Sequence, residues 1–250
     1  MAINAMSQKK TVAFHTIGCK LNFSETSFMG RIFEENNFDR TSFENGADVY
    51  VINTCSVTEN AERECRRIIR NALRISPKAF IIVTGCYAQL NPKEIASIKG
   101  VDVVLGTNEK IDILKYFGEG HKKENAKIYL DKIDKVNSFV DAFSVCDRTR
   151  SFLKIQDGCD YACTYCTVPL ARGKSRSDTI KNVVCNVNKI AATGVKEIIL
   201  TGVNVGDFGG NPNETFLSLI QTIDSLPIEE NKNGIDVLRF RISSVEPNLL

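Results

Sequence analysis

Short apolar runs alternate with longer amphipathic segments through the first 117 residues. Four of the runs have the length and continuous apolar character of buried strands: TVAFHT (11–16), DVYVIN (48–53), AFIIVT (79–84) and VDVVLG (101–106). Helical periodicity fills the gaps, at about 22–37, 57–75, 91–98 and 108–117. Because strands that are apolar throughout are covered on both faces, the pattern predicts an α/β domain with an open parallel, flavodoxin-like sheet over residues 1–117.

A second alternation of strand and helix begins after a polar, lysine-rich segment. Residues 118–150 are predicted to connect the two regions, with weak strand signals in AKIYL and NSFVDAF. The pattern then gives three strands and two helices: a strand at 151–156, a helix at 178–193, a strand at 196–202, a helix at 214–226 and a strand at 236–242. Closing a parallel barrel takes more units than these, so we expect residues 151–250 to be the first part of a (β/α) barrel in a C-terminally truncated chain.

The amino-acid composition limits the class of protein and its cellular compartment but does not indicate a partner. With 43% apolar and 25% charged residues in 250, the chain has the material for two folded domains and is not disordered. No run approaches the roughly 20 apolar residues of a membrane helix, and no secretory signal opens the chain, so we expect a cytoplasmic protein without a membrane partner. The net charge of +2 does not by itself indicate nucleic acid. Nine cysteines in a reducing compartment indicate metal or redox chemistry, not disulfides.

Three cysteines follow three successive predicted strands. Cys19 lies in TIGCKLN, Cys55 in INTCSV and Cys86 in VTGCYAQ. Because the carboxyl ends of parallel strands meet at one edge of a sheet, these residues are expected to converge. A single cysteine would be read as a small apolar core residue. Three at equivalent positions, two of them after a glycine that permits a tight turn, favour a shared metal site.

A second triplet, Cys159, Cys163 and Cys166, lies in the segment GCDYACTYC. A structural zinc site wants four protein ligands, and no suitably spaced fourth ligand follows. A four-iron cluster also takes four outer ligands, so three thiolates leave one iron open to a small molecule with an amino and a carboxylate group.

The remaining three cysteines have no partner at ligand spacing. Cys65 shares a helix face with Ile68 and Ile69 and is predicted to be core. Cys146 and Cys185 are interpreted as structural or incidental.

The second triplet carries a family resemblance. The pattern C-x3-C-x-aromatic-C, with Tyr165 as the aromatic residue, is similar to the signature of radical S-adenosylmethionine enzymes. Three further cysteines on a preceding α/β domain resemble the methylthiotransferases, as does FLKIQDGCDYACTYCTVPLARGKSRS over its whole length. The resemblance runs from about residue 11 to 250. GCKLN (18–22) is similar to the GCKVN of the branch that acts on threonylcarbamoyladenosine in tRNA. The isopentenyladenosine branch, with GCQMN, and the ribosomal-protein branch, with GCPKN, are the alternatives.

The resemblance implies two [4Fe-4S] clusters and S-adenosylmethionine. The cluster on Cys159, Cys163 and Cys166 would bind the cofactor and generate a radical that abstracts the C2 hydrogen of adenine, while the cluster on the first triplet would deliver sulfur. A second S-adenosylmethionine would supply the methyl group. The product would be the 2-methylthio form of the modified adenosine at position 37, just 3′ of the anticodon. The implied partners are tRNA, a flavodoxin- or ferredoxin-type electron donor and a sulfur donor.

Candidate contacts to S-adenosylmethionine lie near the predicted ends of the barrel strands. Tyr165 is a candidate for contact with the adenine or for a shield of the cluster from solvent. LTGVNVGDFG takes the place where the family contacts the methionine end, although it departs from the usual GGE pattern, and RISSVEP ends the third strand. The candidates in these two segments are Gly202, Asn204, Arg241, Ser243 and Glu246, with turn capping as the alternative.

Basic residues suggest where RNA would bind. Arg63, Arg66, Arg67, Arg70 and Arg74 share roughly a 100° sector of one predicted helix, with no acid alternating among them. Arg172, Lys174 and Arg176 in ARGKSRS lie beside the second cysteine triplet. Phosphate contact is one interpretation and a solvated helix face is the other. An iron–sulfur electron carrier or a zinc-stabilised RNA-binding protein remain as rival functions.

Overall fold

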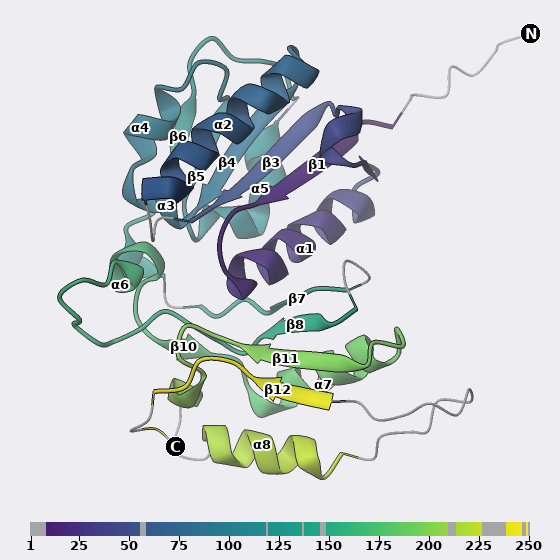
Figure 1. Cartoon of the computed structure of the whole chain (residues 1–250), viewed down its shortest axis with the longest axis vertical. Helices are drawn as coiled ribbons and strands as arrows, with labels where there is room; N and C mark the ends of the chain where they lie inside the picture. The colour runs from purple at the N-terminus through teal and green to yellow at the C-terminus, as the bar shows by residue number, and fades with distance from the viewer. Residues whose placement is uncertain are drawn as a thin grey trace, which may run out of the picture. The chain divides into compact units, whose positions relative to one another are not determined.

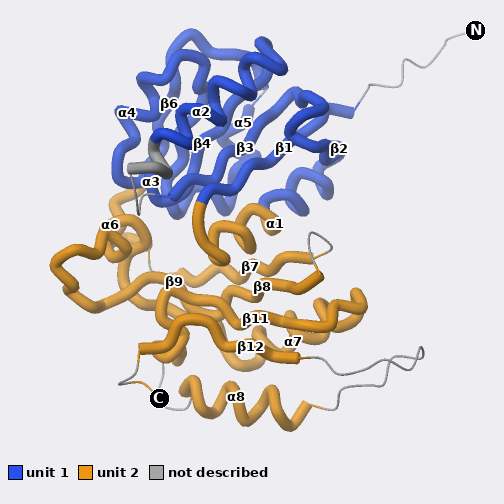
Figure 2. The backbone as a smooth tube through the Cα atoms, in the orientation of Figure 1, with its two compact units in different colours: residues 1–17, 29–130 blue, residues 18–28, 131–250 orange. Residues whose placement is uncertain are grey.

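The computed structural model describes residues 9–55, 59–118, 120–136, 138–145, 149–209, 214–226, 239–246 and Leu249 (Figure 1). Its internal contacts divide the chain into two units, drawn in separate colours in Figure 2. The first unit comprises Met1–Ile17 and Met29–Leu130, and the second comprises Gly18–Phe28 and Asp131–Leu250. The division falls within one helix, α1 (Lys20–Glu35), whose first half belongs to the second unit.

The first unit is built on a six-stranded sheet in which every pairing is parallel. The strand order is β2-β1-β3-β4-β5-β6. The strands are β1 (Thr11–Thr16), β2 (Asp39–Arg40), β3 (Val49–Thr54), β4 (Phe80–Gly85), β5 (Val103–Leu105) and β6 (Lys127–Tyr129). The helices after α1 are α2 (Glu59–Ile75), α3 (Cys86–Leu90), α4 (Pro92–Ala96) and α5 (Ile113–Phe117), with 3-10 turns at Phe43–Asn45 and Glu109–Asp112. The predicted open parallel sheet is confirmed.

Alternate residues of the central strands enter two separate cores. Tyr50 and Ile52 of β3 pack with the buried face of α2 and with α3 and α4. Val49 and Val51 of the same strand pack with α5 and the second half of α1. Both faces of β3 are therefore covered, which is the physical reason for its continuous apolar sequence (Figure 1).

The second unit contains a four-stranded sheet in the order β12-β11-β8-β7. Three strands run parallel, β8 (Ser151–Lys154), β11 (Glu197–Thr201) and β12 (Arg239–Ile242), whereas β7 (Ala142–Phe143) is antiparallel to β8. A short pair, β9 (Gln156–Asp157) and β10 (Arg176–Ser177), follows β8. The helices are α6 (Val168–Arg172), α7 (Ile180–Ala191) and α8 (Phe216–Asp224), with 3-10 turns at Ile133–Lys135 and Val205–Asp207. Leu153, Ile198 and Leu200 form a core with α7 and α8.

Two differences from the predicted elements have clear causes. The helix expected at 91–98 is α4, which Pro92 begins, and a short helix that was not expected, α3, precedes it because Gly85 at φ 100° lets a helix start directly after β4. The segment expected only to connect the regions supplies β6 and β7, which lie on different sheets. Those two strands fall within the weak strand signals AKIYL and NSFVDAF. None of the described helices is long and apolar enough to cross a membrane.

Candidate active site

Two of the first three cysteines lie side by side in the first unit. Strands β3 and β4 are paired in parallel up to Thr54 and Gly85, and Cys55 and Cys86 each come one residue later. Cys55 is buried and Cys86 is half-buried. A Cβ on Gly85 would clash with the Thr54 carbonyl, so glycine permits this close approach of the two strand ends.

Cys19 follows the neighbouring strand. Strand β1 is paired with β3 on the side away from β4, and the Ile17 amide donates to the Asn53 carbonyl at 2.8 Å where that pairing ends. Cys19 comes two residues later, is exposed, immediately precedes α1 and is counted with the second unit. The three cysteines therefore follow three adjacent parallel strands. Their role as ligands of one cluster stays a prediction.

Cys159, Cys163 and Cys166 lie on one loop that leaves β9. The Cys159 amide donates to the Gly173 carbonyl and the Cys166 amide donates to the Cys163 carbonyl, each at 3.1 Å. Cys163 is exposed and the other two are half-buried. Gly158 has φ 72°, and a Cβ there would clash with the Lys174 carbonyl, so the loop is held close to β10.

The thiols of this loop are near enough to influence one another. Burial is the largest cause of the raised pKa of the Cys159 thiol, and the neighbouring Asp207, Cys166 and Cys163 also raise it. In donor type alone, the three cysteines of this loop suit an iron–sulfur cluster, which cysteine thiolates hold. Among the described residues, no group of three or more His, Cys, Asp or Glu side chains has the arrangement for holding a metal ion.

A cavity of about 400 Å³ lies beside the loop in the second unit. It is lined by Asp160, Tyr161, Ser175, Arg176, Ser177, Asp207 and Gly209. Burial raises the pKa of the Asp207 carboxyl, the hydrogen bond from Asn204 opposes this, and Asp160 and Glu246 add to the rise. Two carboxylates and one guanidinium in a cavity of this size suit a small ligand with both an ammonium and a carboxylate group.

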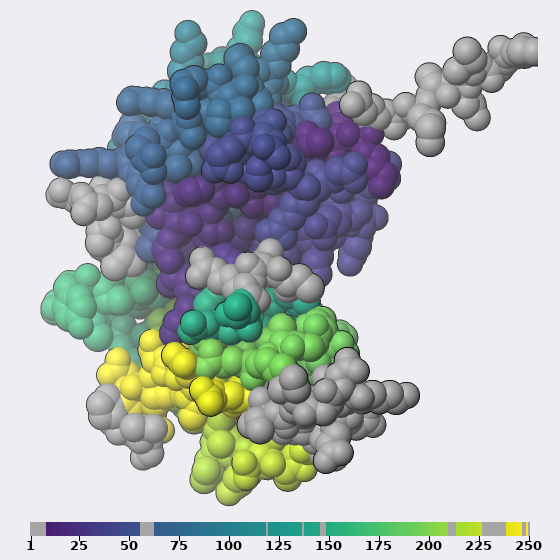
Figure 3. Space-filling model, turned by 45° about the vertical axis from the view of Figure 1, so that its right-hand side comes forward, coloured from purple at the N-terminus to yellow at the C-terminus, as the bar shows by residue number. Residues whose placement is uncertain are grey.

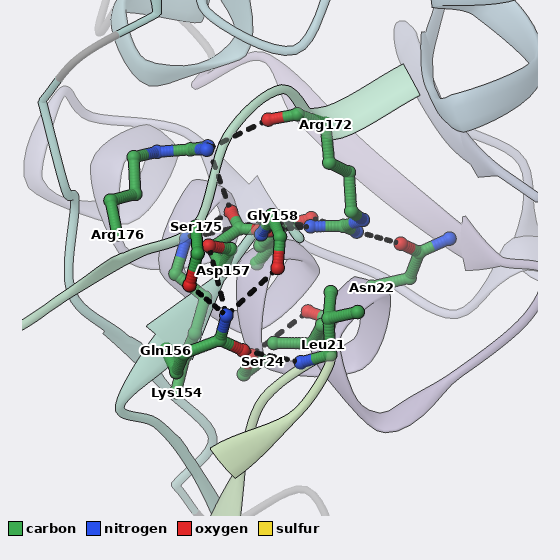
Figure 4. Close-up of polar contacts among 12 residues, drawn as sticks. Leu21, Asn22, Ser24, Lys154, Gln156, Asp157, Gly158, Arg172, Ser175 and Arg176 are labelled. Atoms are coloured by element: carbon green, nitrogen blue, oxygen red, sulfur yellow. Dashed lines mark hydrogen bonds and ion pairs between the residues drawn. The ribbon is translucent and has the colours of Figure 1, made fainter. Parts of the chain in front are cut away.

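An ionic network lies buried beneath the same loop (Figure 4). Arg172 donates to Glu25 Oε1 at 3.1 Å, to Asp157 Oδ1 at 2.9 Å and to Asn22 Oδ1 at 2.6 Å. Lys154 Nζ lies 3.5 Å from Glu25 Oε1 and 3.2 Å from Asp157 Oδ2. The side chains of Glu25, Lys154, Asp157 and Arg172 are each 5% exposed or less. The network joins the first half of α1 to the base of the cysteine loop.

The expectation that Arg172 faces RNA does not fit this burial. Its guanidinium would have to leave two carboxylates to reach a phosphate. Arg176 is also engaged, since it donates to Asp157 Oδ2 at 3.2 Å and to the Arg172 carbonyl at 2.7 Å. Lys174 alone of the three is exposed.

Four residues of this region were not predicted from the sequence: Glu25, Lys154, Gln156 and Asp157. Lys154, Gln156 and Asp157 are polar residues in and just after the apolar strand predicted at 151–156, and this polarity could have indicated that they matter. The Gln156 amide donates to the Gly158 carbonyl at 2.8 Å, and its oxygen accepts from the Val203 and Asn204 amides at 2.8 and 3.0 Å. Gln156 therefore ties the base of the cysteine loop to the loop after β11.

Gly202 and Asn204, both predicted to contact S-adenosylmethionine, lie where the loop after β11 meets Gln156. A Cβ on Gly202 would lie 2.8 Å from Gln156 Oε1, so glycine is needed for the close approach. Asn204 is buried; it donates to Asp207 Oδ2 and accepts from the Glu246 amide, both at 3.1 Å. These contacts position Asp207 in the cavity. Direct contact of Gly202 or Asn204 with S-adenosylmethionine stays a prediction.

The three candidate cofactor contacts on and after β12, which are Arg241, Ser243 and Glu246, have different surroundings. Arg241 pairs with Glu197 through Nε at 3.0 Å and Nη2 at 2.8 Å, and it lines a second cavity. Ser243 Oγ is buried with no hydrogen-bond partner among the described residues. Glu246 is exposed on the segment 239–246, which is coloured yellow on the surface in Figure 3. Tyr165 is 89% exposed, so it does not shield the loop in this structure.

The arginine face of α2 is partly compensated by acids. Arg66 forms an ion pair with Glu94 of α4, and Arg67 Nη2 lies 3.6 Å from Glu64 Oε1. The expectation of a face without acids is therefore wrong at these two positions. Arg63, Arg67, Arg70 and Arg74 are exposed, and contact with RNA stays a prediction for them.

The three cysteines outside the two triplets were interpreted as core, structural or incidental residues. Cys65 is fully buried in the core beneath α2, as predicted. Cys185 is exposed on α7. Cys146 lies outside the described residues.

Residues 11–106 match the model of a family described as uncharacterized protein family UPF0004. A protein with a fold like that of this chain is the radical S-adenosylmethionine methyltransferase TsrM from Kitasatospora setae, solved with tryptophan and an analogue of S-adenosylmethionine. The match has a TM-score of 0.51 at 15% identity and covers 79% of this chain and 48% of that chain. It supports the fold alone.

Curated relatives match almost the whole chain. The threonylcarbamoyladenosine tRNA methylthiotransferase MtaB of Bacillus subtilis is 41% identical over 239 residues, which is 94% of this chain and 51% of that protein. The MtaB of Aquifex aeolicus is 38% identical over 92% of this chain and 55% of its own length. The chain thus spans about half the length of these relatives. This similarity supports the radical S-adenosylmethionine methylthiotransferase family, and within it an MtaB-like protein, over the half of the relatives' length that the chain spans.

Proposed function

We propose that this protein is a tRNA methylthiotransferase that converts N6-threonylcarbamoyladenosine at position 37 to its 2-methylthio form. The observation that carries the proposal is the pair of cysteine triplets, one after three adjacent parallel strands and one on the loop that leaves β9. Support for the substrate comes from relatives that bear the threonylcarbamoyladenosine name and from the GCKLN segment.

Cys159, Cys163 and Cys166 would hold one four-iron cluster, and Cys19, Cys55 and Cys86 a second. When bound, the clusters and S-adenosylmethionine supply the one-electron chemistry and the sulfur and methyl groups that ordinary side chains cannot provide. The protein holds the cysteine loop against β10 through Gly158 and the Cys159 amide. Gln156 fixes the base of that loop relative to the loop after β11.

The cavity beside the loop is the proposed site for the methionine end of S-adenosylmethionine. Asp160 and Asp207 would accept hydrogen bonds from its ammonium group, and Arg176 would contact its carboxylate. Asn204 orients Asp207 for this task by donating to Oδ2. Asp207 therefore replaces Gly202 and Asn204 as the proposed contact after β11.

The proposed partners are tRNA, an electron donor of the flavodoxin or ferredoxin type and a source of sulfur. The proposed contacts to RNA phosphates are Lys174 beside the cysteine loop and the exposed arginines of α2, namely Arg63, Arg67, Arg70 and Arg74. A protein that contacts phosphates through several cations loses affinity as salt concentration rises, so tRNA binding should weaken steeply between low and physiological salt.

The first experiment distinguishes the enzyme from its rivals by metal content. After anaerobic reconstitution, the visible absorption spectrum and the counts of iron, sulfide and zinc are measured. We expect about eight irons and eight sulfides per chain, since each four-iron cluster takes three cysteines here and leaves one iron open. One tightly held zinc with no iron would favour a zinc-stabilised RNA-binding protein. Clusters whose electron paramagnetic spectrum does not respond to S-adenosylmethionine would favour an electron carrier.

The second experiment tests the substrate. Nucleosides from tRNA of cells that lack the gene are analysed by mass spectrometry, with and without the full-length protein restored. Restoration should convert threonylcarbamoyladenosine to its methylthio form and leave isopentenyladenosine unchanged, because a pocket built for a carboxylate and a hydroxyl leaves polar groups unpaired against an apolar substituent. Methylthiolation of isopentenyladenosine alone would refute the substrate while keeping the enzyme class.

A further inference from the structure

A second cavity in the second unit gathers three cations over an apolar floor. Its volume is about 510 Å³, and it is lined by Lys20, Thr149, Arg150, Phe152, Ile199 and Arg241. None of its lining residues is shared with the cavity beside the cysteine loop. A volume of this size falls within the range of small-ligand sites.

The floor is one transverse row of the sheet. Phe152 of β8 is opposite Ile199 of β11, and Ile199 is opposite Arg241 of β12. Because residues opposite one another in register point to the same face, all three side chains rise from the sheet together. Phe23 of α1 packs edge-to-face on Phe152 with ring centroids 5.6 Å apart. Lys20 lies three residues earlier on the same side of α1, which brings its ammonium over this row.

Glu197 holds two of the cations in place. It lies two residues before Ile199 on β11, so its side chain is on the same face. One oxygen accepts from Arg241 at 2.8 and 3.0 Å, and the other lies 3.6 Å from Arg150 Nε. Glu197 is only 15% exposed, whereas the Arg150 and Arg241 side chains are 44% and 53% exposed. The carboxylate thus anchors the guanidiniums from below and leaves part of each open to the cavity.

These four side chains carry three positive charges and one negative charge. The net charge of this group is therefore positive and attracts a ligand carboxylate, and guanidinium groups bind carboxylates with two parallel hydrogen bonds. Phe152 and Ile199 offer an apolar surface for the rest of the ligand. The site is therefore suited to a carboxylate joined by a short chain to a planar or apolar body.

Resting on the proposed function, we infer that Lys20, Arg150 and Arg241 bind the carboxylate of the threonylcarbamoyl group. The basic residues beside the cysteine loop are less suited to this carboxylate, since Arg172 is buried against Glu25 and Arg176 donates to Asp157. Lys20 is the middle residue of GCKLN, so this segment has a direct contact with substrate as well as a candidate cluster ligand. Isopentenyladenosine, which lacks a carboxylate, gains nothing from these cations.

The test uses the full-length protein and the free nucleosides N6-threonylcarbamoyladenosine and adenosine. Lys20→Met and Arg150→Met are compared with Lys189→Met, an exposed cation of α7 outside this cavity. Losing one charge-assisted hydrogen bond should weaken binding of the threonylcarbamoyl nucleoside about 10- to 100-fold. Binding of adenosine should not change, nor should the control differ from the wild type. Because Arg241→Met leaves Glu197 with one fewer partner, Arg241→Lys, which keeps the charge, is measured beside it and should recover part of the binding.

Three outcomes would overturn the inference. Equal losses for both nucleosides would show that the cations do not recognise the substituent. Weaker binding of an unmodified anticodon stem-loop by the same factor would assign them to a backbone phosphate, and weaker binding of S-adenosylmethionine would assign them to the cofactor. Failure of the proposed function is a separate result, in which the wild type binds the nucleoside selectively and forms no methylthio product from its tRNA.

Discussion

Replacement of Arg172 by methionine tests whether the buried ionic network stabilises the second unit. Arg172 makes hydrogen bonds with both oxygens of Glu25, with Asp157 and with Asn22. After its loss, Asp157 keeps Lys154 and Arg176, each at 3.2 Å, whereas Glu25 keeps Lys154 at 3.5 Å. We expect Glu25 to bear more of the effect than Asp157, because its ion pair with Lys154 is longer than the two ion pairs of Asp157.

Removing one partner of a buried ion pair costs about 3–5 kcal/mol. The remaining cations lessen the penalty here, so we expect the free energy of unfolding to fall by about 3 kcal/mol, the lower end of that range. Urea denaturation at pH 7, followed by circular dichroism, measures the change. Lys174→Met, an exposed cation two residues along the chain, is the matched control and should change stability by less than about 0.5 kcal/mol.

The double variant Arg172→Met/Glu25→Leu tests whether Arg172 and Glu25 act as an ion pair. It removes the buried carboxylate together with the arginine that faces it, so it should be more stable than Arg172→Met alone, because two apolar side chains replace a buried pair at little cost. A single variant within about 1 kcal/mol of the wild type, or a double variant less stable than the single one, would show that the network does not act as an ionic unit.

Three further predictions concern cluster content, backbone geometry and pH. Replacing Cys159, Cys163 and Cys166 together by alanine should halve the bound iron; loss of all of it, or of none, would contradict separate sites. Gly158→Ala should lower the unfolding free energy by at least about 1–3 kcal/mol, measured by thermal or urea unfolding, because a Cβ at φ 72° is strained and meets the Lys174 carbonyl. Burial lowers the pKa of His15 below its ordinary 6.5, with Glu64 opposing, so stability is fully present above that value and falls as the pH drops through the folded-state pKa. Titration of unfolding between pH 7.5 and 5 should show this slope in the wild type and a shallower one in His15→Gln; equal slopes would refute it.

Local patterns were sufficient for most elements of both sheets. The four apolar runs of the first region and the three of the second are strands, because a segment buried on both faces, or on one, must carry that requirement in its own residues. The placement of Cys55 and Cys86 after paired strands follows from parallel topology, which the alternation of strand and helix already implies. The edge strands β6 and β7 were only weak signals, because a strand of two or three residues has too few positions to show a period.

The functions of the charged residues could not be derived in the same way. Arg172 in ARGKSRS has the composition of an exposed basic loop, yet it is buried because Glu25, 147 positions earlier, supplies a carboxylate beneath it. Arg241 likewise shares Glu197, which lies 44 positions earlier, with Arg150. Neither pairing is visible in the residues that surround each arginine in the sequence.

Local residue patterns are enough to identify the segments that form strands and helices and the cysteines that lie at strand ends. Which cations remain available to a ligand depends on contacts that form only in the folded protein. The physical reason is that hydrophobic periodicity is a property of neighbouring residues, whereas the burial and pairing of a charge depend on side chains brought together from distant parts of the chain. Lys20 and Arg172 are both basic residues beside candidate cluster ligands, but the first lines an open cavity and the second is enclosed by carboxylates.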